Sequence, residues 1–192
     1  MAASAAGVRG HTAGAYWATM RHAVDKPSRE LSDPKELLLG FLDYYRSAIG
    51  RKMEGLTDSE LRTSRLPSGW TPLELLKHLV FMEQRWLQWG FMAEPMPSPH
   101  GDEDEAGRWH VGPEETAAEL IAALHAGGER TRAAVAAHEL TAVAAAGGRF
   151  SDADPLPWPS LAWILVYVLQ EYARHAGHLD VARELADGVT GE

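Results

Sequence analysis

The chain has 192 residues, a formal net charge of -9 at pH 7 and no cysteine. This length is enough for one medium-sized domain that buries its core without disulfides. Nucleic-acid binding is excluded because the basic residues form no cluster that could hold a phosphate backbone, and the lack of cysteine excludes disulfides, thiolate zinc sites and a cysteine nucleophile.

Residues 1–32 are expected to form a partly ordered N-terminal arm, because they show no sustained hydrophobic periodicity and Lys26-Pro27-Ser28 reads as a break. Arg9 and His11 stand where a signal peptide would need a longer apolar stretch. The longest apolar run of the chain, Leu161 to Leu169, is far shorter than the roughly 20 residues that span a bilayer. We therefore expect a cytoplasmic protein with no membrane partner.

Two sequence patterns typical of helix N-termini follow the predicted arm, at Asp33 and at Thr71. Asp33 is a suitable N-cap with Pro34 at the first helical position, and apolar residues then recur at helical spacing up to Gly55. Thr71 and Glu74 form the capping-box pattern, with a proline between them at the first helical position. The sequence thus predicts a first helix that ends near Gly55 and a second helix that begins after Thr71.

The second helix is expected to run to Phe91 or Glu94, since prolines follow it. The connection from Pro95 to Val111 is longer than most loops. Such a loop is either a disordered excursion or a functional lid over a site. In the lid reading, His100 and His110 are candidate contacts.

Two further helices complete the predicted fold. Pro113 at the first helical position and the acids that follow it predict a third helix opening at Gly112. Ser160 is a fair N-cap for a fourth helix that ends near Asp187. No alternating strand pattern is present, so the sequence predicts an all-α, antiparallel four-helix bundle over residues 33–188, followed by a C-terminal tail at 189–192.

Three polar side chains interrupt the apolar stripe of the fourth helix. Glu171, His175 and His178 share one helix face with apolar residues on both sides. Burying a carboxylate or an imidazole costs on the order of several kcal/mol unless a hydrogen-bond partner or a metal ion compensates. Residues four apart on a helix can both reach one ion, so Glu171 and His175 form a candidate chelating pair.

A third ligand has to come from another helix, and His78 in the apolar part of the second helix is the best candidate. Two imidazoles and one carboxylate suit Zn²⁺, and also Ni²⁺, Fe²⁺ or Mn²⁺. His178 either replaces Glu171 as a ligand or serves beside the ligands as a base, and we favour the second role. The alternative without a metal is a hydrogen-bonded core histidine at position 78 and a surface ion pair of Glu171 with Arg174 or Arg85.

These residues resemble a known family. The run Ser68-Gly69-Trp70-Thr71-Pro72, then His78, then the segment from Glu171 to Asp180 is similar to the DinB superfamily, with an actinobacterial branch of unknown function as the nearest group. The resemblance spans residues 33–188. It implies a bundle of up-down-down-up order and a metal held by one histidine of the second helix and two residues four apart in the fourth.

Many DinB-like proteins carry histidine at the first position of that pair, whereas this chain has Glu171. In this it resembles the N-terminal domain of mycothiol-dependent maleylpyruvate isomerase, with a His, Glu and His trio. The resemblance therefore implies His78, Glu171 and His175 as metal ligands, and mycothiol or another low-molecular-weight thiol as cofactor. Related bundles often form homodimers.

Two hypotheses of function follow. The first is a thiol-dependent S-transferase or isomerase, in which a divalent metal holds the small-molecule thiol as thiolate for an electrophilic substrate and His178 assists proton transfer. A variant of this reading is a hydrolase that uses metal-bound water. The second hypothesis is a stress protein that binds a metal or small ligand without catalysis, since no further catalytic motif is present.

Overall fold

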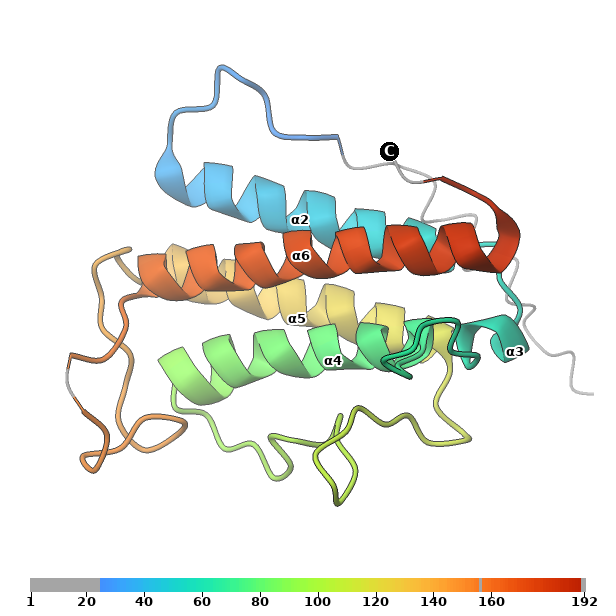
Figure 1. Ribbon diagram of the computed structural model, residues 1–192. Coiled ribbons are helices and arrows are strands. Elements are labelled where there is room, and N and C mark those ends of the chain that lie inside the picture. Colours follow the sequence, from blue (N-terminus) through green and yellow to red (C-terminus); the bar gives the residue numbers. More distant parts are fainter. Residues whose placement is uncertain (1–24, 156, 191–192) are drawn as a thin grey trace, which may run out of the picture.

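The computed structural model describes residues 25–155 and 157–190 (Figure 1). The regular secondary structure of the described residues is helical, with no β-strand beyond two isolated bridge pairs. The all-α prediction is therefore confirmed. None of the helices in this part of the chain is both long and apolar enough to cross a membrane. In chain order the elements are α2 (Pro34–Met53), α3 (Asp58–Leu61), α4 (Pro72–Trp86), the π-helical turn η1 (Leu87–Phe91), α5 (Ala117–Ala137) and α6 (Leu161–Asp187).

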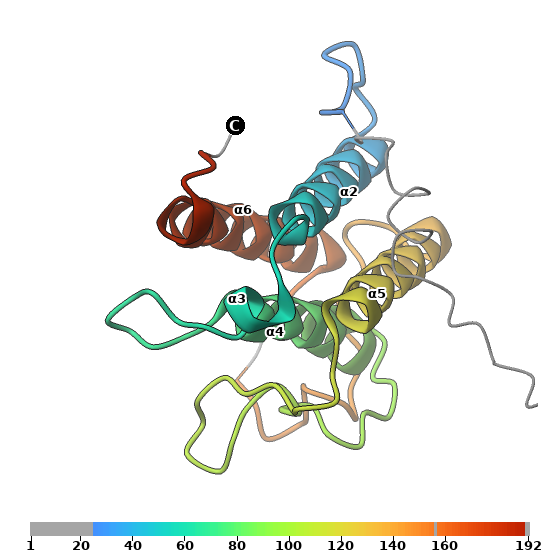
Figure 2. The ribbon, with the colours of Figure 1, turned by 90° about the vertical axis from the view of Figure 1, so that its right-hand side faces the viewer.

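The four long helices pack around one apolar core. Figure 1 shows α2 and α6 running in one direction and α4 and α5 in the opposite direction. The end view in Figure 2 shows the four helices grouped around a common centre. The main packing pairs are α2 with α6 and α4 with α5, and α4 also packs against α6. A long connection between η1 and α5 returns along α4, so that the segment from residue 92 to 116 covers one side of this helix (Figure 1).

Three of the helices begin where the sequence predicted. The side chains of Asp33, Thr71 and Ser160 each accept a hydrogen bond from a backbone N–H in the first turn of α2, α4 and α6. The last helix ends at Gly188, whose φ of 78° favours glycine. The short helix α3, with its own capping box at Thr57, was not predicted.

The predicted start of the third helix at Gly112 and Pro113 is wrong. The helix begins after Thr116, whose hydroxyl accepts from the Glu119 N–H while the Glu119 carboxylate accepts from the Thr116 N–H. This reciprocal pair satisfies two N–H groups, whereas proline at the first position only removes one donor. Residues 112–115 instead form a turn, in which the Glu115 carboxylate accepts from the Gly112 N–H at 2.6 Å.

The second helix reaches Phe91, within the predicted range, but its last turn is π-helical. The connection from Gly147 to Phe150 packs directly onto this turn, where the Arg149 N–H donates to the Trp89 carbonyl at 3.0 Å. A Cβ on Gly148 would lie 1.9 Å from the same carbonyl oxygen, so only glycine fits. Of the predicted arm, residues 1–24 lie outside the described residues, and 25–32 form a loop with a turn before α2; residues 191–192 of the tail also lie outside.

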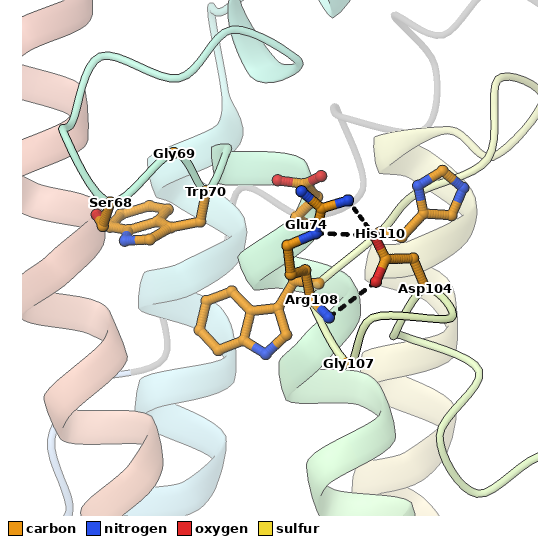
Figure 3. Close-up of a pocket in the computed structure, with 9 residues that line it drawn as sticks. Ser68, Gly69, Trp70, Glu74, Asp104, Gly107, Arg108 and His110 are labelled. Atoms are coloured by element: carbon orange, nitrogen blue, oxygen red, sulfur yellow. Dashed lines mark hydrogen bonds and ion pairs between the residues drawn. The ribbon is translucent and has the colours of Figure 1, made fainter.

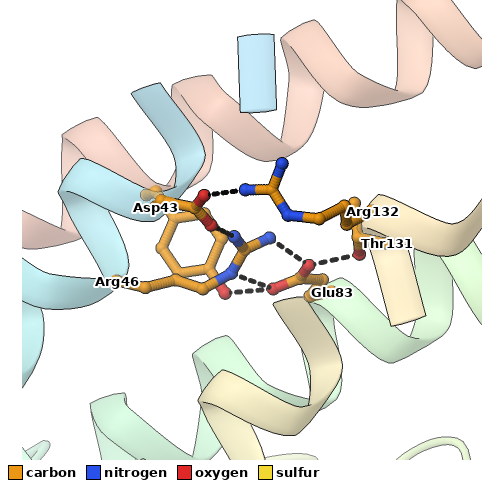
Figure 4. Close-up of polar contacts among 6 residues, drawn as sticks. Asp43, Arg46, Glu83, Thr131 and Arg132 are labelled. Carbon is orange, nitrogen blue, oxygen red and sulfur yellow. Dashed lines mark hydrogen bonds and ion pairs between the residues drawn. The ribbon is translucent and has the colours of Figure 1, made fainter. Parts of the chain in front are cut away.

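A buried carboxylate joins the four long helices (Figure 4). Glu83 of α4 accepts hydrogen bonds from the Arg46 guanidinium of α2, at 3.0 and 2.5 Å, from the Thr131 hydroxyl of α5 at 2.5 Å and from the Tyr172 hydroxyl of α6 at 2.5 Å. Arg46 also pairs with Asp43 at 2.7 Å, and Asp43 in turn pairs with Arg132 of α5. Arg46 and Glu83 are each only 1% exposed.

The electrostatics of this cluster follow from its burial. Burial by itself acts to lower the pKa of Arg46, but the nearby Glu83 carboxylate, together with Tyr172 and Asp43, outweighs burial, so that the net pKa is raised. Burial and the same carboxylate raise the pKa of Tyr172 well above its ordinary value. Arg46 is therefore charged and Tyr172 remains a hydrogen-bond donor, which satisfies the four acceptor positions of Glu83.

Replacing Glu83 with glutamine should destabilise the fold by about 3–5 kcal/mol, because the Arg46 charge would remain buried without its counter-charge. The free energy of unfolding in urea, followed by helical circular dichroism, measures this loss. Glu129→Gln neutralises an exposed acid on α5 and serves as the control, with a change below about 0.5 kcal/mol. A Glu83→Gln protein as stable as this control would contradict the structural role of the cluster.

Candidate metal centre

The candidate metal ligands come from two helices that pack against each other. His78 lies on α4, seven residues after the N-cap, between buried leucines that hold its face toward the core. Glu171 and His175 lie one turn apart on α6 and are both buried, at 9% and 5% exposed. Because side chains four apart share a helix face, the two project together toward α4.

The structure brings the three side chains to one point. One potential ligand atom from each of His78, Glu171 and His175 lies within 4.8 Å of the others. His175 Nε2 is 3.3 Å from Glu171 Oε2. Two ligands of a tetrahedral ion with bonds of about 2.0–2.1 Å stand about 3.3 Å apart, so this pair already has the required separation.

The chemistry of the donors also fits a divalent cation. No lysine or arginine of the described residues forms an ion pair with Glu171, whose one ion-pair contact is the neighbouring His175. Arg85 pairs with Asp102 instead, and Arg174 is exposed. A buried carboxylate beside two imidazoles lacks a compensating positive charge, which a bound divalent ion would supply.

His175 is poised as a neutral ligand. Burial, followed by the positive charge that neighbouring His78, His178 and Arg174 contribute, lowers its pKa to about 3. Its Nδ1 lies 3.2 Å from Nδ1 of His178, so one ring nitrogen is engaged by His178 while Nε2 faces Glu171. A metal-binding histidine commonly has its second nitrogen held in this way.

His78 is held from its other side by an acid on the long connection. Its Nδ1 lies 3.0 Å from Oδ2 of Asp102, a residue with no exposed surface. Both oxygens of Asp102 accept from the Arg85 guanidinium, at 2.5 and 3.1 Å. Burial by itself raises the pKa of Asp102, but the hydrogen bonds from His78 and Arg85 outweigh it and lower the net pKa.

An open cleft of about 600 Å³ lies beside this centre (Figure 3). Two indoles connect them: Trp109 stacks on His78 with ring centroids 4.2 Å apart, and Trp70 lies 6.1 Å from the ring of His178. Trp109 is also 5.6 Å from the ring of His175. The cleft is lined by Ser68, Gly69, Trp70, Glu74, Asp104, Gly107, Arg108, Trp109 and His110.

The long connection forms a wall of the centre. Of its two candidate contacts, His110 lines the cleft, whereas His100 is exposed and pairs with Glu103. Two residues of this connection, Asp102 and Trp109, contact the candidate ligand His78, and the sequence analysis did not single out either of them. The proline-rich start and the acidic run around Asp102 are typical of a solvated loop, so no local signal marked these two residues as buried.

A family model described as mycothiol-S-transferase matches residues 37–188. A solved structure, described as the conserved protein of locus from Enterococcus faecalis, is similar over 83% of this chain and 100% of that chain, with 21% sequence identity and a TM-score of 0.55. At this identity the likeness concerns the fold alone. Among curated proteins, none matches the chain.

We expect the metal-free protein, kept in chelator, to hold His175 uncharged until the pH falls toward 3. Between the ordinary value of 6.5 and about 3, the unfolded chain binds a proton that the folded chain does not, so stability is lost as the pH falls through this range. Nuclear magnetic resonance of the His175 ring measures the titration directly. A midpoint near 6.5 would contradict the burial argument.

The lowered pKa of His175 also makes the free energy of unfolding depend on pH. Lowering the pH from 6.5 to 5 should cost the parent about 2 kcal/mol more than a His175→Gln variant, whose side chain has no titrating ring. Urea unfolding in chelator at the two pH values gives the difference.

Proposed function

This chain belongs to the mycothiol-S-transferase family, and from that membership and the geometry of the centre we propose that it is a divalent-metal-dependent S-transferase acting on mycothiol or a related small-molecule thiol. The observation that carries the proposal is the convergence of His78, Glu171 and His175 next to an open cleft, in a chain with no cysteine of its own. The nucleophilic sulfur would therefore come from the thiol substrate.

We propose His78, Glu171 and His175 as the residues that hold the ion. Zinc suits this donor set best, and nickel, iron and manganese also accept it. When bound, such an ion supplies a Lewis acid that lowers the pKa of a coordinated thiol. Glu171 contributes the one negative charge among the three donors, while His175 is already neutral at physiological pH.

The cleft is the proposed binding site for the body of the thiol and for an electrophilic co-substrate. Trp70 and Trp109 provide flat apolar surfaces at the end nearest the histidines. Glu74 and the Arg108 guanidinium, which pairs with Asp104 at 2.8 Å, provide polar groups on the walls. Such a mixed lining suits a polar molecule that carries its reactive sulfur at one end.

In the proposed reaction, the S–H bond of the thiol breaks and its proton goes to a base. The sulfur then forms a carbon–sulfur bond as an alkyl halide releases halide, an epoxide ring opens, or the C=C bond of an unsaturated carbonyl compound is added to, and the last two products take up a proton. We propose His178 as the base. It is half-buried, contacts the cleft residue Trp70 and is not one of the three ligands. At rest its Nδ1 accepts a hydrogen bond from His175 and so orients the ligand ring. Because Nε2 of a neutral ring then carries the other proton, His178 has to leave this contact to accept the thiol proton at Nδ1.

Assays of zinc-loaded protein with mycothiol and a panel of alkyl halides, epoxides and unsaturated carbonyl compounds test the activity. We expect formation of a thioether or adduct that depends on both the metal and the thiol. Tight binding of the thiol without turnover across the panel would instead support the non-catalytic binding protein.

We predict that His78→Ala empties the metal site, since the ion would lose its one donor from α4 and keep only the pair on α6. Elemental analysis of purified protein measures metal per chain. His100→Ala, which removes an exposed histidine of the long connection, is the matched control and should retain the parent content. Full occupancy in His78→Ala would show that His78 is not a ligand.

The variant His178→Gln distinguishes the two proposed roles of His178, which are to orient the His175 ring and to accept the proton of the thiol. A glutamine oxygen can still accept a hydrogen bond from His175 but cannot carry a proton at neutral pH. We expect zinc content to stay at the parent level while turnover falls about 100-fold, the lower range for loss of a general base. With His100→Gln as control, parent turnover per bound zinc in His178→Gln would leave His178 with orientation only.

A further inference from the structure

We infer that Asp102 is the positioning residue for His78: its carboxylate, fixed by Arg85, sets the imidazole so that Nε2 faces Glu171 and His175. The inference rests on the proposed metal site but not on the reaction. It gives a function to a loop residue that no sequence pattern singles out.

A hydrogen bond holds the Nδ1 side of the His78 ring. Asp102 Oδ2 lies 3.0 Å from Nδ1 of His78, and a carboxylate can only accept. Nδ1 must therefore carry the proton, which leaves the lone pair of a neutral imidazole on Nε2. A histidine can bind a metal only through such a nitrogen, so this contact selects the binding form of the ring.

The Asp102 carboxylate cannot rotate away from His78. Arg85, on the same helix as His78, grips both carboxylate oxygens and also donates to the Pro99 carbonyl at 3.0 Å. The Asp102 side chain is fully buried and that of Arg85 is 8% exposed. Two parallel donors from one guanidinium fix both the position and the plane of a carboxylate.

Asp102 also brings Trp109 onto His78. The backbone carbonyl of Asp102 accepts from the His110 N–H at 2.8 Å, and Glu103 forms a bridge pair with Trp109. This narrow turn places the Trp109 ring flat on His78, 24° from parallel. The side chain of Asp102 thus contacts the edge of the His78 ring, and its backbone hydrogen bond helps to place Trp109 over the face of that ring.

Asp102→Asn tests the inference. The amide places an NH₂ group against either Arg85 or His78 and removes the charge, so the ring loses its fixed orientation. We expect the dissociation constant for zinc, measured by competition with a chromophoric chelator, to rise about 10- to 100-fold. Glu105→Gln neutralises an exposed acid of the same connection and should bind zinc like the parent.

A second measurement needs neither metal nor activity. Nitrogen chemical shifts of the His78 ring in metal-free parent protein report which nitrogen carries the proton. We expect protonated Nδ1 and bare Nε2 in the parent, and a mixture of tautomers in Asp102→Asn. Because the parent alone gives the first result, the inference stays testable even if the variant does not fold.

The outcomes separate this inference from the proposed function. A parent with the Nε2-protonated tautomer, or a folded Asp102→Asn protein with parent zinc affinity, would overturn the positioning role. A parent that binds zinc through an Asp102-dependent site but transfers no thiol would overturn the S-transferase proposal and leave the positioning role in place.

Discussion

The hydrogen bonds of Glu83 fix how the four helices of this protein stand relative to one another. A carboxylate that is almost fully buried needs every acceptor position filled, and the partners that fill them come from α2, α5 and α6. Apolar packing alone tolerates small slides of one helix along another, whereas a satisfied polar cluster does not. The fold therefore has one register in which Arg46, Thr131 and Tyr172 all reach the same side chain.

The geometry of the proposed metal centre depends on that register. Tyr172, which contacts Glu83, is the residue next to Glu171, and Arg85, which holds Asp102, follows Glu83 by two positions on α4. These contacts fix the packing of α4 against α6 close to the place where His78 approaches Glu171 and His175. Ligands on rigid helices, supported by a second set of fixed contacts, keep their relative positions better than ligands on loops.

Local periodicity made much of this predictable from the sequence. The spacing of Glu171 and His175 sets them on one helix face whatever the rest of the chain does, and the caps at Asp33, Thr71 and Ser160 depend only on neighbouring residues. The start of α5 was misplaced because two local signals competed, and the reciprocal cap at Thr116 prevailed. Asp102 and Trp109 depend on how a long connection folds back onto α4, which no local pattern encodes.

The donor set of the centre contains nitrogen and oxygen but no sulfur. Thiolate ligands of zinc are themselves targets of peroxides, which convert them to sulfenic acids or disulfides and release the metal. Imidazole and carboxylate ligands do not undergo this chemistry. In a protein without cysteine, the only thiol of the proposed reaction belongs to the small molecule, so peroxide would consume the proposed substrate without oxidising a ligand of the candidate metal centre to a disulfide or sulfenic acid.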